Sequence, residues 1–175
     1  MIMKKVVLDT NVLLVAISDR SKLHWVFESL INNAYMICVS TDILAEYAEI
    51  IGQKMGGLVS ESVLATIENL PNVELITAYY HFGLLTDEDD NKFVDCAIAA
   101  NASFIVSHDK DFDILKNIPF PTVNVIDTTF AKCFFKVRRE KESPTNPKHF
   151  YEIAFQSSAG FLPTRRTLNN THITF

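Results

Sequence analysis

The sequence lacks several features that would place it in a membrane or in an oxidising compartment. No apolar run approaches the roughly 20 residues of a membrane span, and the apolar run near the first residue is too short for a signal peptide. Three cysteines, Cys38, Cys96 and Cys133, stand far apart in apolar stretches, so we expect buried thiols rather than disulfides. These absences predict a cytoplasmic protein without a membrane partner.

Glycine and histidine are also scarce, which narrows the possible chemistry. The five glycines fit neither dinucleotide-binding nor Walker spacing. The five histidines are dispersed, without the spacing of metal ligands, which argues against a zinc site. Only His108 lies next to an acidic cluster, so it is the one histidine that we keep as a candidate.

Charge is distributed unevenly along the 175 residues. Residues 1–131 hold 8 Lys and Arg against 18 Asp and Glu, whereas residues 132–175 hold 8 against 3. The length suits one domain with a good core and a short appendage. We therefore predict an acidic domain over 1–136 and a basic, aromatic-containing extension over 137–175.

Short apolar runs alternate with helical patterns along the predicted domain. Strands are predicted at 4–8, 35–39, 73–76, 104–107 and 123–126, and helices at 23–32, 42–51, 60–70 and from about residue 89 onward. Such alternation is typical of an α/β protein with a five-stranded, mostly parallel sheet and helices on both faces.

Carboxylates recur where these elements meet. Asp9 and Asp109 follow predicted strands, Asp90 and Asp95 lie at the start of a helix, and Glu46 can reach the same edge of the sheet. Asp95 shares a helical face with apolar residues, so its burial requires a cation or hydrogen-bond donors. Glu46 has an alternative interpretation, in which it lies at the margin of an apolar stripe and extends to water.

A divalent cation would turn the repulsion among these carboxylates into binding. Mg²⁺ and Mn²⁺ prefer oxygen ligands, and such sites suit the hydrolysis of phosphodiester bonds. Thr10 and Asn11 can hold a water or a phosphate oxygen there, or cap the first helix, and spacing alone favours neither role.

Four segments taken together resemble the PIN-domain family, and within it the toxin components of prokaryotic toxin–antitoxin pairs. They are residues 7–12, Glu46, residues 89–95 and residues 105–112, in the family's order and spacing. The resemblance implies a three-layer α/β/α sandwich and a ribonuclease that depends on Mg²⁺ or Mn²⁺.

The resemblance also implies roles for individual residues. Asp9, Glu46, Asp95 and Asp109 correspond to the family's catalytic, metal-binding acidic quartet, with Asp90 an additional or alternative metal ligand. Asp111 is an alternative to Asp109 in the same role.

Partners are predicted less specifically. We expect Arg138 and Arg139, in the basic segment that opens the extension, to help bind RNA phosphate. The extension can also hold an antitoxin protein or extend a homodimer, the commonest symmetric assembly.

Three rival functions remain open at this point. A haloacid-dehalogenase-like phosphatase needs a second aspartate two positions after the first, where this chain has Asn11. A structure-specific DNA nuclease uses the same carboxylate chemistry. A catalytically silent module would only bind RNA or a partner.

Overall fold

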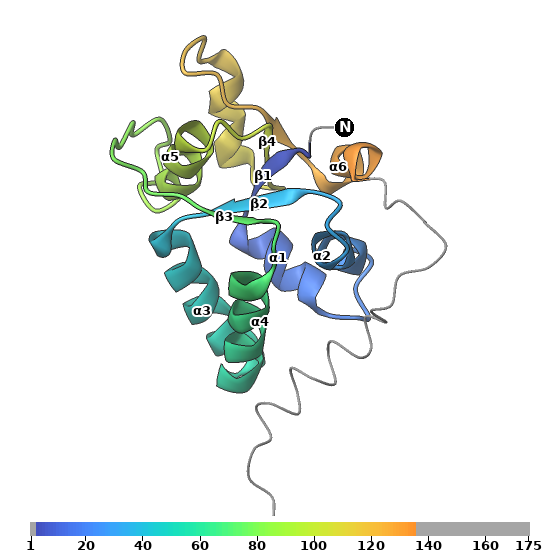
Figure 1. The fold of residues 1–175 in the computed structure, drawn as a ribbon. Helices are drawn as coiled ribbons and strands as arrows, with labels where there is room; N and C mark the ends of the chain where they lie inside the picture. The colour runs from blue at the N-terminus through green and yellow to red at the C-terminus, as the bar shows by residue number, and fades with distance from the viewer. Residues whose placement is uncertain (1–2, 136–175) are drawn as a thin grey trace, which may run out of the picture.

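Five short strands form a single parallel sheet, as the sequence predicts. The computed structural model describes residues 3–135, so the predicted extension, with Arg138 and Arg139, lies outside the described residues. The sheet has the order β3-β2-β1-β4-β5, and every neighbouring pair is parallel (Figure 1). The strands are β1 (Lys5–Leu8), β2 (Met36–Val39), β3 (Val73–Leu75), β4 (Phe104–Val106) and β5 (Val125–Ile126).

Burial on both faces explains why the inner strands consist of consecutive apolar residues. Val6, Val7 and Leu8 of β1 are all fully buried, because β1 lies between β2 and β4 and helices cover both faces of the sheet. On one face lie α1 (Thr10–Ile17), α2 (His24–Ile31), α3 (Thr41–Met55) and α4 (Gly57–Asn69). On the other lie α5 (Asn91–Ala99) and the 3₁₀ helix η1 (Lys110–Asn117), and α6 (Thr128–Phe134) ends the described chain.

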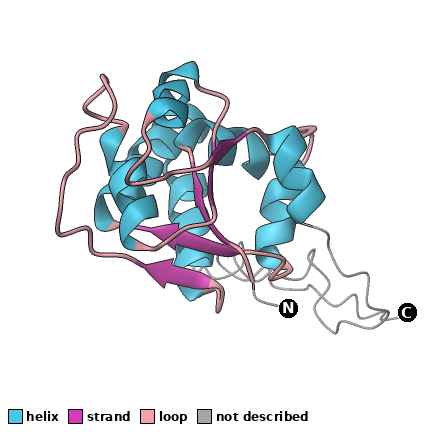
Figure 2. Cartoon of the chain, turned by 90° about the horizontal axis from the view of Figure 1, so that it is seen from above, coloured by secondary structure: helices cyan, strands magenta, loops and turns pink. Residues whose placement is uncertain are grey.

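These layers confirm the predicted α/β/α architecture. Figure 2 shows the strands running between helices when the molecule is seen from above. Local signals place the helix ends, since the Ser40 side chain accepts a hydrogen bond from the backbone N–H of Ile43 and so caps α3. Gly56, with φ of +97°, separates α3 from α4.

Two expectations require correction. The sequence predicts the first helix over 23–32, but α1 begins directly after Asp9. The residues from Val12 to Ile17 are all apolar, so apolar and polar positions do not alternate with the 3.6-residue repeat that predicts a helix. In addition, Cys133 is exposed, whereas Cys38 and Cys96 are buried as expected. No helix within residues 3–135 is long and apolar enough to cross a membrane.

The order of the strands creates a natural binding position beside β1. The chain moves outward from β1 through β2 to β3, and then returns across the sheet to β4 on the other side of β1. Parallel α/β sheets bind ligands at such a reversal, beyond the carboxyl ends of the strands. Asp9 follows β1 at this point.

Candidate functional site

Asp9 is held in place by hydrogen bonds at the end of β1. It is the N-cap of α1, and its Oδ1 accepts a hydrogen bond of 2.9 Å from the backbone N–H of Asn11. Its other oxygen accepts a hydrogen bond from the Ser107 hydroxyl. The two residues meet because β1 pairs with β4, with Leu8 opposite Val106. Asp9 is thus a buried carboxylate in a defined orientation.

Ser107 also links Asp9 to Asp109. The Ser107 Oγ accepts a hydrogen bond of 2.9 Å from the backbone N–H of Asp109, while its hydroxyl donates to Asp9. Asp109 in turn caps η1 by accepting a hydrogen bond of 2.9 Å from the N–H of Asp111. Ser107 is not among the site residues predicted from the sequence, although its place directly after β4 is a signal that identifies it.

Glu46 reaches the site from α3 and forms an ion pair with Lys92 of α5. Both side chains are about a quarter exposed, at 24% and 23%. The alternative in which Glu46 simply extends to water therefore does not describe its contact. Lys92 is not among the site residues predicted from the sequence either, although it lies two residues after Asp90.

Asp90 completes this group of carboxylates. It is the N-cap residue of α5 but makes no capping hydrogen bond through its side chain. Burial, which has the largest effect, and the charges of Asp87, Asp9, Asp109 and Glu46 together raise the pKa of Asp90 to about 6. The shift shows that these carboxylates lie close enough to repel one another.

The pKa of Asp9 is raised for the same reasons. Burial has the largest effect, and the charges of Asp109 and Glu46 add to it. The hydrogen bonds from Ser107 and Asn11 oppose the rise, because they stabilise the ionised form.

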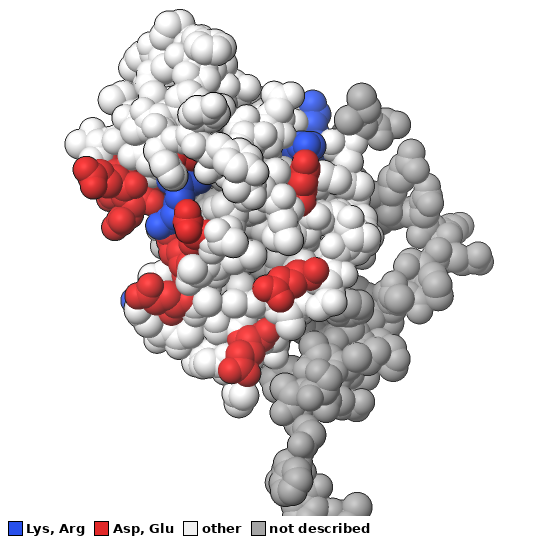
Figure 3. Space-filling model, turned by 60° about the vertical axis from the view of Figure 1, so that its left-hand side comes forward, with Lys and Arg blue, Asp and Glu red and all other residues white. Residues whose placement is uncertain are grey.

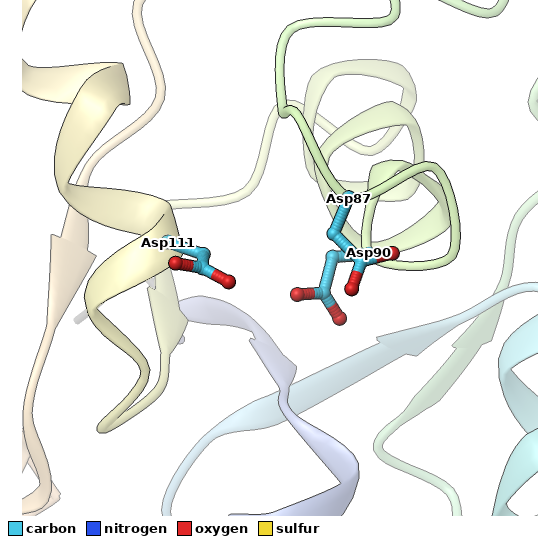
Figure 4. A group of neighbouring side chains, drawn as sticks. All are labelled: Asp87, Asp90 and Asp111. Atoms are coloured by element: carbon cyan, nitrogen blue, oxygen red, sulfur yellow. The ribbon is translucent and has the colours of Figure 1, made fainter.

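A second group of carboxylates shares Asp90. Asp87, Asp90 and Asp111 each offer an oxygen, and these oxygens lie within 4.8 Å of one another. Figure 4 shows Asp111 facing Asp87 and Asp90 from the opposite side. From the sequence, Asp111 is only an alternative to Asp109, and Asp87 is not among the predicted site residues.

An open cleft runs beside this second group. Its volume is about 690 Å³, and it is lined by Thr86, Asp87, Glu88, Lys110, Asp111 and Ile114. Acidic side chains gather along one side of the molecule, with a few basic ones among them (Figure 3). The cleft lies between the turn before α5 and the start of η1, so a ligand in it would adjoin the carboxylates.

Asp95 is buried, as predicted, but both of its oxygens accept hydrogen bonds from a loop. The backbone N–H of Phe82 donates to Oδ1 at 3.0 Å, and the Nδ1 of His81 lies 2.9 Å from Oδ2. The sequence left open whether a cation or hydrogen-bond donors compensate the buried Asp95 carboxylate. In the structure, hydrogen-bond donors of the protein do so.

The remaining candidates occupy distinct positions around the site. The Thr10 hydroxyl is buried and has no hydrogen-bond partner among the described residues. The Asn11 side chain is exposed, and its backbone binds Asp9. The Nε2 atom of His108 lies 2.9 Å from the Thr128 hydroxyl, so this ring nitrogen contacts α6.

The donor set fits a hard divalent cation. The clustered ligand atoms are carboxylate oxygens, which Mg²⁺ and Mn²⁺ prefer. The pKa values of Asp9 and Asp90 are raised mainly by burial and then by the neighbouring carboxylates. Asp9, Glu46, Asp90 and Asp109 are the residues that could hold such an ion, with Asp87 and Asp111 next to them.

Tyr47 offers a test of how the fold positions this group. Its buried hydroxyl donates a hydrogen bond of 2.6 Å to the Leu8 carbonyl, which joins the residue after Glu46 to the residue before Asp9. Tyr35 is equally buried, and its hydroxyl donates to the Val26 carbonyl of α2.

Both Tyr→Phe changes should lower the free energy of unfolding by about 1–2 kcal/mol in urea titrations. Only Tyr47→Phe should weaken Mn²⁺ binding measured by calorimetry, and equal Mn²⁺ affinity in the two variants would contradict this positioning.

Asp90 predicts an unusual dependence of stability on pH in metal-free protein. Because its folded pKa of about 6 exceeds the ordinary aspartate value of 3.8, the folded state binds more protons between these values, and stability falls as pH rises through this range. Asp90→Asn should therefore stabilise the metal-free protein at pH 7.5 and have little effect near pH 4, as measured by urea unfolding. The neighbouring Asp89→Asn, at an exposed position, is the control. A stabilisation of equal size in both variants would show that the effect comes from lowering the net negative charge of the protein and not from the raised pKa of Asp90.

Comparisons with known proteins agree with this architecture. A chain in the crystal structure of VapBC2 from Rickettsia felis bound to a DNA fragment from their promoter is similar, with 19% sequence identity and a TM-score of 0.52. The match covers 70% of this chain and 98% of that chain, and at this identity it shows the fold. A search of curated proteins finds no matching relative.

The family comparison covers the site itself. The family model described as PIN domain matches residues 5–111, from β1 to the start of η1, and this range contains all the clustered carboxylates. It spans more than half of the sequence. The chain belongs to the PIN-domain family.

Proposed function

We propose that this chain is a ribonuclease that depends on Mg²⁺ or Mn²⁺ and hydrolyses phosphodiester bonds of RNA. The observation that carries the proposal is the group of carboxylates at the reversal of strand order, in a chain of the PIN family. PIN domains are generally nucleases. A bound divalent ion in such a site lowers the pKa of a water and stabilises the charge that develops on phosphate.

The protein's own residues would hold the ion in a fixed position. Asp9 and Asp109 share the Ser107 hydroxyl, which fixes their separation across β1 and β4. Glu46 is available from the neighbouring α3, although its carboxylate must exchange the Lys92 ammonium for the ion. Asp90 would contribute from the start of α5, where a bound cation would lower its raised pKa.

Asp95 has a supporting role in this proposal. Both of its oxygens hold the loop at residues 81 and 82, which leaves Asp90 as the member of α5 that faces the other carboxylates. The sequence resemblance assigned Asp95 to the acidic quartet instead. The two assignments differ in their effect on metal affinity, so they can be tested directly.

Substrate contacts are expected on either side of the carboxylates. Thr10 and Asn11 lie at the start of α1 beside Asp9, where hydroxyl and amide groups can bind a phosphate oxygen. Arg138 and Arg139 stay predictions of the sequence, as residues that bind RNA phosphate.

We further propose that the protein is the toxin of a toxin–antitoxin pair in the cytoplasm. The sequence resemblance to such toxins supports this role, and so does the shared fold with a chain of the VapBC2 complex. An antitoxin protein is then the expected partner, and a homodimer remains a prediction from the general frequency of twofold assemblies.

The first test is cleavage of a labelled RNA pool by purified protein with Mg²⁺, with Mn²⁺ and with EDTA. The wild type should cut only with metal, and Asp9→Asn and Asp90→Asn should each lower the rate at least about a hundredfold, because each removes charge from the ion's ligands. Asp95→Asn should retain Mn²⁺ affinity in calorimetry.

Several results would contradict parts of this assignment. Cutting that survives in Asp9→Asn would place the site elsewhere or indicate a contaminating nuclease. Lost Mn²⁺ affinity in Asp95→Asn would restore Asp95 to the metal ligands. Faster cleavage of a matched DNA strand would favour a DNA nuclease, and binding of RNA without any cleavage would favour the silent module.

The basic extension supplies a separate prediction. Truncation after Val137 should lower RNA affinity and reduce the slope of log affinity against log salt, because fewer lysines and arginines would displace counterions from phosphate. Fluorescence anisotropy of an RNA oligonucleotide at several salt concentrations measures both quantities. An unchanged slope would show that the extension makes no phosphate contacts.

A further inference from the structure

An exposed aromatic loop lies beside the carboxylates. We use this name for residues 79–83, between β3 and α5, at the carboxyl edge of the sheet (Figure 1). The exposed fractions are 83% for Tyr79, 77% for Tyr80 and 41% for Phe82, and the His81 side chain is 79% exposed. Four successive ring-bearing side chains that remain in water are unusual, since burial of aromatic surface is favourable.

The chain uses a buried carboxylate to hold this loop. Asp95 is only 2% exposed, and its two oxygens accept hydrogen bonds from the Phe82 N–H and the His81 ring. Desolvating a carboxylate is costly, so these bonds are needed to satisfy it, and they define the backbone at the centre of the loop. Gly83 follows with φ of +58°, a conformation that glycine adopts readily.

A second anchor fixes the far end of the loop to the same helix. The Asn91 side chain accepts a hydrogen bond of 2.9 Å from the Leu85 N–H and donates one of 3.2 Å to the Leu85 carbonyl. Asn91 is the first residue of α5 and follows Asp90 directly. One helix therefore carries a carboxylate of the cluster and both anchors of the aromatic loop.

The distance along this helix is short. Asp90 and Asp95 are five residues apart, about 7.5 Å along a helix axis and about 140° around it, so their side chains leave the helix on different sides. The chain brings the loop close to the carboxylates, because Asn91 binds Leu85 beside Asp90 and only Thr86 separates Leu85 from Asp87. A strand of nucleic acid with a phosphate at the carboxylates would therefore have neighbouring nucleotides near the loop.

Electrostatics make uncharged contacts valuable at this edge. Residues 1–131 hold 8 Lys and Arg against 18 Asp and Glu, and Lys92, the lysine next to Asp90, is already paired with Glu46. A polyanion gains little from such a surface apart from any bound metal. Stacking of bases on aromatic rings does not depend on charge and is available to every base.

We propose that the aromatic loop is a binding platform for unpaired bases of the RNA strand whose phosphate lies at the carboxylates. The inference rests on the proposed function and narrows its substrate class to single-stranded segments, because paired bases in a duplex do not expose their faces. The rings of Tyr79 and Tyr80, the two most exposed of the loop's aromatic side chains, supply the stacking surface. Asp95 is then a positioning residue that acts through His81 and Phe82.

The test measures binding rather than cleavage, in full-length protein carrying Asp9→Asn. One probe is a twelve-nucleotide adenosine RNA with a 2-aminopurine, whose fluorescence is quenched by stacking, and the other is an abasic chain of equal length. Tyr79→Ala with Tyr80→Ala should weaken binding of the adenosine RNA about tenfold or more and abolish the quenching. Affinity for the abasic chain and the slope of log affinity against log salt should stay unchanged.

Two controls separate stacking from other effects. Tyr79→Phe with Tyr80→Phe keeps both rings and should keep affinity and quenching. Phe120→Ala removes another aromatic side chain that is 86% exposed, and it should change neither. All of these positions are exposed, so urea unfolding should show little loss of stability.

The outcomes distinguish this inference from the proposed function. Unchanged RNA affinity in the alanine variant would overturn the platform, and metal-dependent cutting by the wild type would still support the ribonuclease. Unchanged RNA affinity together with altered self-association in sedimentation would assign the loop to a protein contact and also overturn the platform. Wild-type protein that neither binds nor cuts RNA would overturn both.

Discussion

Repulsion among carboxylates at the carboxyl edge of β1 and β4 is the constraint on which the rest of the site depends. Burial is the largest cause of the raised pKa values of Asp9 and Asp90, and this repulsion adds to it. The fold limits the cost with a few local contacts, namely the Ser107 hydroxyl and the Asn11 N–H at Asp9 and the Lys92 ammonium at Glu46. A divalent cation would complete the compensation, which is why the same arrangement that destabilises the metal-free protein suits metal binding.

Helix α5 connects the features that matter for function. Its N-cap residue Asp90 belongs to the carboxylates, Lys92 pairs with α3, and Asp95 holds the aromatic loop. The helix also packs against β1, β2 and β4. Movement of this helix would therefore disturb metal ligands and loop together, which gives the proposed catalytic and base-binding surfaces a common mechanical support.

Much of the fold could be predicted because short buried strands and capped helices leave strong local patterns. The five strands and the helices predicted over 23–32, 42–51 and 60–70 all followed from such patterns. Helix α1 could not, since a segment that is apolar on every side has no period. Asp9 and Asp109 were predicted to lie at one edge because parallel strands place their carboxyl ends together, and β1 and β4 are neighbours in the sheet.

The sequence by itself determined the fold class, the acidic character of the domain and the set of carboxylates from which a site could be built, because these depend on periodicity, composition and strand order. Only the tertiary structure decided how the carboxylates are used. Asp90 and Asp95 lie on one helix within two turns, yet Asp90 faces the other acids and Asp95 binds His81 and Phe82. The spacing of two residues along a helix sets the directions in which their side chains point, but the groups that those side chains contact come from other segments of the chain.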